Sequence, residues 1–211
     1  MARGRFITLE GGEGAGKSTL AAGLSEALNS AGVETVITRE PGGTPNAEAL
    51  RALLVEGEPG RWSPLAETLL LYAARADHMR RVIEPALERG AYVICDRFSD
   101  STRAYQGAAG GLDPARLEAI HQASMAGFAP DLTLIVDLDP RIGLERTRRR
   151  GEAATRFERQ PDAFHDALRA AFLAIAEAEP RRCIVLDGAQ APHAVLAAAL
   201  GALRERLGAP A

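Results

Sequence analysis

The segment from Phe6 to Thr19 constrains the fold of this chain more than any other. An apolar stretch at residues 6–10 is followed by a glycine-rich run and then by residues with helical spacing. The run matches the pattern G-x-x-x-x-G-K-[ST] and consists of Gly11, Gly12, Glu13, Gly14, Ala15, Gly16, Lys17 and Ser18, with Thr19 after it. A strand, this loop and a helix, in that order, are the context in which the pattern binds nucleotide phosphates.

Each position of the loop has a physical role. Glycines let backbone N–H groups turn toward an anion, and the helix N-terminus adds partial positive charge. Lys17 would contact the outer phosphates, and the Ser18 hydroxyl would bind Mg²⁺. The alternative is a glycine-rich turn that matches by chance, since the chain has 21 Gly. Lys17 is the only lysine in the chain, which favours a functional site.

Length and composition limit the class of protein. A chain of 211 residues suits one α/β domain over residues 1–211. A net charge of −3 argues against general nucleic-acid binding, and no apolar run has membrane-spanning length. The first residues lack the pattern of a signal peptide. We therefore expect a cytoplasmic protein in which Cys95 and Cys183 are buried free thiols rather than a disulfide.

Hydrophobic patterning predicts strands that alternate with helices. The predicted strands are residues 6–10, 33–38, 91–95, 132–138 and 183–186. The predicted helices are residues 20–28, 46–55, 63–84, 113–127, 161–178 and 192–207, with one more beginning at Pro140. Pro85 should kink or end its helix, residues 107–111 should form a flexible turn, and residues 151–160 should be irregular. The alternation favours a doubly wound α/β domain with its ligands at the carboxyl ends of the strands.

Charged residues follow three of these strands. Glu10, Arg39-Glu40 and Asp96-Arg97 should meet at one edge of the sheet. Asp96 suits the acidic strand end that orients Mg²⁺, although a turn-capping carboxylate is the alternative. Arg39, Arg51, Arg75 and Arg97 could together bind a phosphate, although any one of them could be a solvated surface residue.

Several segments together carry a family resemblance. They are residues 11–19, Arg-Glu-Pro-Gly-Gly-Thr at 39–44, Tyr-Ala-Ala-Arg at 72–75, Asp-Arg at 96–97 with Ala-Tyr-Gln at 104–106, and Pro-Asp-Leu-Thr-Leu at 130–134. With these segments the chain resembles the thymidylate kinases, a family of nucleoside monophosphate kinases. The resemblance implies a phosphate-loop kinase fold with a parallel five-stranded sheet covered by helices on both faces. It also implies transfer of the γ-phosphoryl of ATP to dTMP, giving dTDP, with Mg²⁺ as cofactor and a homodimer as the assembly.

The resemblance also implies roles for individual residues. The loop from Gly11 to Thr19 would bind ATP, Ser18 and Asp96 would hold Mg²⁺ directly or through water, and Lys17, Arg97 and Arg156 would be catalytic. Glu13 and Tyr105 would lie near the acceptor sugar, where Tyr105 disfavours a 2′-hydroxyl. The implied dTMP-binding residues are Glu13, Glu40, Arg51, Leu71, Arg75, Arg97, Thr102, Tyr105 and Gln106. Residues 148–160 would form a mobile lid that carries Arg156.

Some positions depart from the family pattern. Leu71 stands where the family usually has a Phe that stacks on thymine, so either Leu71 packs on the base or Tyr72 takes part of that role. Gly14 stands where some members carry a catalytic Arg, which favours an arginine from the lid. The lid arginine could be Arg156 or one of the run 148–150, and that run could equally be a solvated helix end.

Two other functions remain open from the sequence. One is a nucleoside monophosphate kinase for a different acceptor, because the loop pattern is shared. The other is a phosphate-loop regulatory protein whose nucleotide state switches a partner interface.

Overall fold

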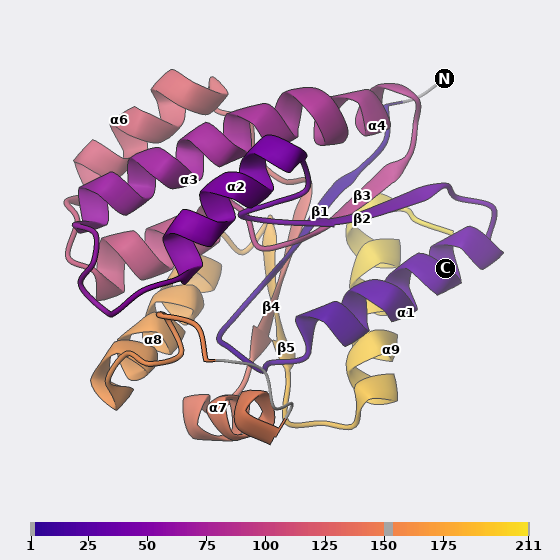
Figure 1. Ribbon diagram of the computed structural model, residues 1–211. Coiled ribbons are helices and arrows are strands. Elements are labelled where there is room, and N and C mark those ends of the chain that lie inside the picture. Colours follow the sequence, from indigo (N-terminus) through magenta and orange to yellow (C-terminus); the bar gives the residue numbers. More distant parts are fainter. Residues whose placement is uncertain (1–2, 150–153, 211) are drawn as a thin grey trace.

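The computed structural model describes residues 3–149 and 154–210. Five parallel strands form one sheet in the order β2-β3-β1-β4-β5 (Figure 1). The strands are β1 (Phe6–Glu10), β2 (Thr35–Arg39), β3 (Tyr92–Asp96), β4 (Leu132–Asp137) and β5 (Cys183–Asp187). The side chains of β1 are all buried, as expected for the central strand of a parallel sheet that is covered on both faces.

The register brings the charged strand ends together. Leu9 pairs with Asp96, and Asp96 also pairs with Arg39 of the next strand. In the other half of the sheet, Asp137 at the end of β4 pairs with Asp187 at the end of β5. Because every strand runs in the same direction, these residues lie along one edge of the sheet, where the sequence predicts the ligands.

Two helices cover one face of the sheet. They are α1 (Lys17–Ser30) and α9 (Pro192–Leu207), and both pack on a core that includes Ile7, Leu9 and Leu134 (Figure 1). A Cβ on Gly23 of α1 would lie 2.9 Å from the Leu196 side chain of α9, so the absence of a side chain there lets the two helices approach closely.

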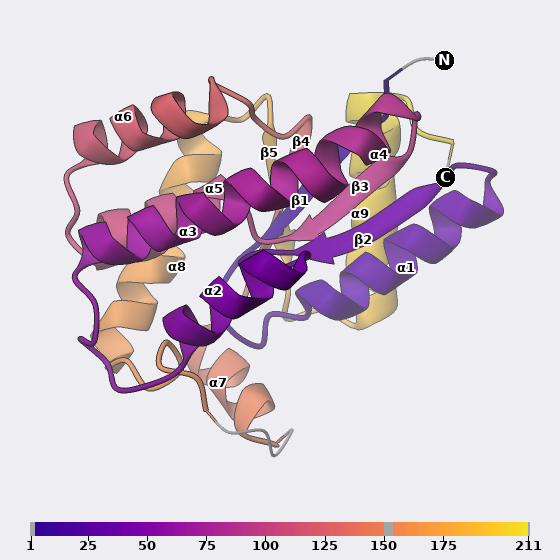
Figure 2. The ribbon, with the colours of Figure 1, turned by 45° about the horizontal axis from the view of Figure 1, so that its top comes forward.

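A second layer of helices covers the opposite face (Figure 2). One part packs around Phe6 and Phe98, and another packs around Tyr105 and Phe172. The layer contains α3 (Pro64–His78), the π-helical segment η1 (Met79–Ile83), α4 (Glu84–Glu88), α5 (Ser99–Thr102), the π-helical segment η2 (Arg103–Ala109), α6 (Pro114–Met125) and α8 (Asp162–Ala178). The predicted sheet with helices on both faces is confirmed.

The remaining helices lie near the carboxyl edge of the sheet. They are α2 (Pro45–Val55) and α7 (Pro140–Arg149).

The starts of three helices share one pattern, a capping side chain followed by Pro in the first turn. Thr44, Ser63 and Asp113 accept hydrogen bonds from Ala47, Ala66 and Arg116 N–H groups, at 3.1, 3.2 and 2.9 Å.

One local prediction holds in part and another is wrong. The regular helix α3 gives way to a π-helical turn, η1, just before Pro85, and α4, which contains Pro85 in its first turn, ends at Glu88. A wider turn of this kind accommodates a proline that lacks the N–H of a regular helix. Most of the predicted flexible turn at 107–111 is instead the end of η2, whose side chains pack against α8.

The predicted lid, residues 148–160, lies only partly within the described residues, since 150–153 fall outside them. Residues 154–160 form turns without a helix or strand, as predicted. Cys95 and Cys183 are both buried and free, which confirms that prediction. Within residues 3–149 and 154–210, none of the helices combines the length and apolar character needed to span a bilayer.

Candidate active site

The phosphate loop connects β1 to α1 and takes a shape that requires glycine. Gly11, Gly14 and Gly16 have φ angles of 130°, 65° and 98°. A Cβ on Gly11 would lie 2.4 Å from the Val136 carbonyl oxygen, which is too close for any side chain. The Lys17 ammonium donates to the carbonyl oxygens of Gly11 at 3.2 Å and of Gly12 at 2.8 Å. The motif therefore forms a compact loop with the Lys17 ammonium packed against it.

The predicted magnesium ligands lie together. The Ser18 hydroxyl, in the first turn of α1, donates to the Asp96 carboxylate at 3.2 Å. Within the described residues there is no group of three or more His, Cys, Asp or Glu side chains that could hold a metal by themselves. Mg²⁺ is commonly held by one or two protein oxygens plus substrate phosphates, so this pair of oxygen donors fits that ion.

Arg97 links the phosphate loop to the segment that follows β3. One nitrogen, Nη1, donates to the Gly11 carbonyl at 3.0 Å and to the Ser101 hydroxyl at 3.2 Å. The other, Nη2, donates to Glu13 at 3.0 Å, and Tyr105 donates its hydroxyl to the same carboxylate oxygen at 2.7 Å. Burial opposes ionisation of Glu13, but the charges of Arg97 and Lys17 outweigh it and lower the pKa of Glu13 to about 2.

The pKa of Glu10 is shifted in the opposite direction to that of Glu13. Its buried carboxylate accepts hydrogen bonds from the Phe98 N–H at 2.8 Å and the Ser101 hydroxyl at 2.6 Å. Burial, with a smaller contribution from the charge of Asp100, raises the pKa of Glu10 to about 7. Glu10 thus holds the backbone that follows β3 and carries Arg97.

Arg75 extends from α3 into a buried ion-pair cluster. Its Nε donates to Glu40 at 2.6 Å and its Nη2 donates to the Thr102 hydroxyl at 3.1 Å. His78 contacts the other oxygen of Glu40 at 3.1 Å. The Nη1 of Arg75 and the Oε1 of Gln106 are buried without a hydrogen-bond partner among the described residues. Such atoms are rare in folded proteins and commonly mark a place where a ligand or water binds.

A cavity that is partly open to solvent, with about 610 Å³ of empty space, lies beside this cluster. All nine residues that the sequence predicts for dTMP binding line it. The lining also includes residues that the prediction missed, namely Pro41, Val55, Phe98, Ser101, Thr155 and Phe157. Arg39 does not line it and instead pairs with Glu48 at 2.9 Å on the surface. The cavity therefore gathers side chains from segments that are far apart in the sequence.

Comparisons with known proteins identify the family. The family model described as thymidylate kinase matches residues 9–198. This chain belongs to the thymidylate kinase family. The thymidylate kinase of Caulobacter vibrioides is 53% identical over 208 residues, which cover 99% of this chain and 100% of that relative. The thymidylate kinase of Chromohalobacter salexigens is 49% identical over 210 residues, 98% of each chain.

A solved structure agrees with the sequence comparison. The crystal structure of thymidylate kinase from Ehrlichia chaffeensis has a TM-score of 0.78 and 32% sequence identity, over 95% of this chain and 99% of that one. The phosphate-loop kinase fold is therefore shared with that family member.

The structure distinguishes Leu71 from Tyr72, the two side chains considered for contact with the base. Leu71 lines the cavity. Tyr72 does not, and its hydroxyl lies 3.1 Å from His121 Nδ1 while its ring packs under the Arg75 guanidinium. Of the two side chains, Leu71 is thus the one available for contact with a ligand in the cavity.

Arg156 does not lie with the phosphate loop. Its side chain is 1% exposed, and it donates from Nη1 to Glu67 and from Nε and Nη2 to the Leu54 carbonyl at 3.1 and 2.8 Å. Among the lid-side arginines, Arg146 of α7 does reach the loop, with Nη1 at 3.5 Å from the Gly14 carbonyl. No sequence pattern indicated Glu67, whose contact with Arg156 joins residues 89 positions apart.

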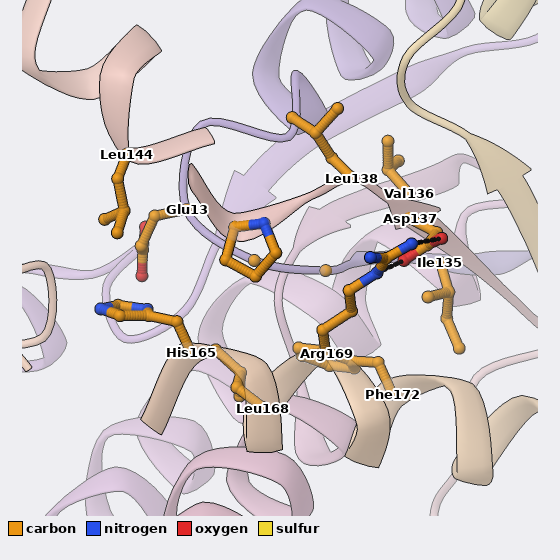
Figure 3. Close-up of a pocket in the computed structure, with 13 residues that line it drawn as sticks. Glu13, Ile135, Val136, Asp137, Leu138, Leu144, His165, Leu168, Arg169 and Phe172 are labelled. Atoms are coloured by element: carbon orange, nitrogen blue, oxygen red, sulfur yellow. Dashed lines mark hydrogen bonds and ion pairs between the residues drawn. The ribbon is translucent and has the colours of Figure 1, made fainter. Parts of the chain in front are cut away.

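A second, smaller cavity, partly open to solvent and with about 400 Å³ of empty space, borders the phosphate loop between β4, α7 and α8 (Figure 3). At its far end Arg169 donates to both oxygens of Asp137 at 2.7 Å, as the dashed lines show. His165 and Glu13 lie at the other end. The Arg169–Asp137 ion pair thus joins α8 to the end of β4 beside the phosphate loop.

Proposed function

We propose that this protein transfers the γ-phosphoryl group of ATP to dTMP, giving dTDP and ADP. Family membership supports the reaction class, and the observation that carries the acceptor is the 610 Å³ cavity next to the phosphate loop. Arg75 Nη1 supplies an unpaired donor there and Gln106 Oε1 supplies an unpaired acceptor. A donor and an acceptor match the carbonyl O4 and the N3–H of thymine.

The chain's cations contribute to the charge neutralisation that phosphoryl transfer requires. An oxygen of the dTMP phosphate, whose second pKa is about 6, forms the new bond to the γ-phosphorus. The bond from that phosphorus to the β–γ bridging oxygen breaks, and ADP leaves with the electron pair. No general base is needed, so positioning and charge neutralisation carry the catalysis. Lys17 would contact the transferring group, and Arg97 with Arg51 would hold the acceptor phosphate.

Ser18 and Asp96 are the residues that would hold Mg²⁺. When bound, Mg²⁺ neutralises charge on the outer phosphate oxygens of ATP. Arg51 is suited to an anion because its guanidinium is partly buried and makes one hydrogen bond to the Pro41 carbonyl at 2.9 Å. Burial and the nearby charge of Arg39 lower the pKa of Arg51, and a bound phosphate would relieve both costs.

The candidates for the lid arginine are Arg156 and two arginines of α7, Arg146 and Arg148, and their positions favour α7. Arg156 could reach the transferring group only by leaving Glu67 and the Leu54 carbonyl. Arg146 and Arg148 lie on the exposed surface of a helix whose Gly143 touches the phosphate loop. We therefore propose that α7 supplies the charge and that Arg156 organises the acceptor cavity, whose wall includes its neighbours Thr155 and Phe157.

Steady-state kinetics of three variants test this assignment. Arg146→Ala and Arg148→Ala should lower kcat while leaving the KM for dTMP near the wild-type value. Arg156→Lys should mainly raise the KM for dTMP. An Arg156→Lys enzyme that loses kcat at unchanged KM would return the catalytic role to Arg156.

Three further properties are proposed. The chain acts as one domain, 1–211, with a lid at 148–160. A homodimer is supported by apolar side chains exposed on adjacent helices, Leu53 at 41% on α2 and Leu69 at 53% on α3, and sedimentation would measure it. The two buried free thiols suit a reducing cytoplasm.

A coupled assay that follows ADP release tests the function. It would compare dTMP, dUMP, dGMP, AMP and CMP as acceptors, with Lys17→Ala as a control that should lose transfer. We expect the highest kcat/KM with dTMP. Faster transfer to a purine monophosphate would refute the proposed acceptor, and ATP binding without transfer to any of them would favour a regulatory protein.

A further inference from the structure

Glu67 is a buried carboxylate that joins the lid segment to the acceptor cavity. It lies on α3 and is 8% exposed. Its Oε1 accepts from Arg156 Nη1, and its Oε2 accepts from Gln106 Nε2 at 2.8 Å. Arg156 is itself held in place, because its Nε and Nη2 donate to the Leu54 carbonyl. The order of contacts is therefore Leu54 carbonyl, Arg156, Glu67 and Gln106.

This chain of contacts determines which end of the Gln106 amide faces the ligand. A carboxylate paired with an arginine accepts hydrogen bonds and donates none. The Gln106 NH₂ group must therefore face Glu67, and the Oε1 atom must face the other way. That Oε1 atom is buried without a partner among the described residues, and the same holds for Arg75 Nη1. Gln106 and Arg75 both line the cavity.

We propose that Glu67 is a positioning residue for base selection, and this inference rests on the proposed function. It orients Gln106 so that the cavity offers an acceptor beside the Arg75 donor. Thymine presents the complementary pair, an N3–H donor and an O4 acceptor. Cytosine presents the opposite pair, an N3 acceptor and an N4 donor, and would place an acceptor against Gln106 Oε1 and a donor against Arg75.

The alternative amide orientation is strongly disfavoured. Rotating the Gln106 amide would place Oε1 against Glu67 Oε2, two acceptors without a hydrogen between them. Rotation would break the hydrogen bond from Gln106 Nε2 to the charged Glu67 carboxylate. The loss of such a bond lowers the population of the rotated amide roughly tenfold to hundredfold. Glu67 therefore contributes to selectivity without touching the nucleotide.

Glu67→Gln should reverse the polarity of the cavity. Arg156 has only donors, so it would hold the oxygen of the new amide and leave its NH₂ facing Gln106. Gln106 would then turn its own oxygen toward residue 67 and its NH₂ toward the base. We expect the Kd for dTMP to rise at least tenfold and the ratio of the dCMP Kd to the dTMP Kd to fall at least tenfold, measured by calorimetry.

The double variant Glu67→Gln with Gln106→Glu provides the rescue. The amide at 67 would donate to the new carboxylate at 106, whose second oxygen again faces the base as an acceptor. Selectivity for dTMP over dCMP should return to within a fewfold of the wild type. Glu84→Gln, on the exposed surface of α4, is the matched control and should change neither Kd.

The outcomes separate this inference from the proposed function. Wild-type protein that does not phosphorylate dTMP would refute the proposed function, and this inference with it. With an active wild type, a folded Glu67→Gln variant whose Kd ratio stays within twofold would overturn the positioning role alone. The positioning role would also be overturned if Glu67→Gln weakened the binding of dTMP and dCMP equally and the double variant did not restore dTMP binding. A purely structural role of Glu67 predicts that result.

Discussion

A single methyl group at Gly143 should disturb the phosphate loop. Gly143 lies in α7, and a Cβ built there would be 2.1 Å from the Glu13 carbonyl oxygen. On the other side of the same contact, a Cβ on Gly14 would lie 2.0 Å from the Gly143 carbonyl oxygen. Backbone therefore packs directly on backbone where the lid-side helix meets the loop, and neither side can adjust by moving a side chain.

The size of the effect follows from this geometry. Real Cβ contacts essentially never fall under 3.0 Å, so Gly143→Ala must move the Glu13 carbonyl or α7 by at least 0.9 Å. A displacement of about 1 Å in a catalytic group can cost on the order of 10²-fold in rate. Gly143 has an ordinary helical backbone, where Ala without a clash would stabilise by ~0.5–1 kcal/mol. We therefore expect kcat/KM to fall about 100-fold in the coupled assay, with no gain in Tm.

Gly201→Ala is the matched control for this prediction. Gly201 also lies within a helix, α9, but a Cβ there meets nothing within 4 Å. This variant should keep full activity and gain a few degrees in Tm. If Gly143→Ala behaves like Gly201→Ala in both measurements, the close packing of α7 on the loop is not needed for catalysis and the reasoning fails.

Two other substitutions test the site. The pKa of Glu10 is raised from 4.5 to about 7 in the folded protein. Between about pH 4.5 and pH 7, Glu10 therefore keeps its proton in the folded protein but has lost it in the unfolded chain. The free energy of unfolding consequently falls as the pH rises through this range. Urea unfolding should show the wild type losing about 3 kcal/mol relative to Glu10→Gln between pH 4.5 and pH 8, and parallel pH profiles would contradict the shift. Leu71→Phe should tighten dTMP binding in calorimetry by adding ring contact with the base, and weaker binding would argue against stacking at that position.

Sequence patterns predicted the fold well where local signals are strong. The continuous apolar run at 132–138 and the Ser63-Pro64 helix start both correspond to observed elements. The segment after β3 was harder, because its many polar residues resemble a loop. In the structure Ser99, Asp100, Ser101 and Thr102 are all buried, and tertiary contacts such as that between Ser101 and Glu10 satisfy their polar groups. Local polarity therefore did not indicate that this segment is helical and buried.

Some residues of the candidate site were likewise predictable from the sequence and others were not. Residues that follow strands or belong to the loop motif were predicted in position, because parallel strands bring their carboxyl ends to one edge. Ser18 and Asp96, 78 positions apart, illustrate this, since a rule of topology places them together. No such rule places Arg156, because the lid segment is neither a strand end nor part of the motif.

The partners of Arg156 can be rationalised only after the fold is known. A buried guanidinium requires a carboxylate and acceptors for its other N–H groups, since an unpaired buried charge is very costly. Glu67 and the Leu54 carbonyl meet that requirement, and both come from helices that the sequence predicted correctly as helices. The prediction of helices could not say which of their polar groups face inward. An arginine in a lid-like segment is therefore ambiguous from sequence between a catalytic and a positioning role, and the contact with the buried Glu67 carboxylate supports the positioning role that we propose.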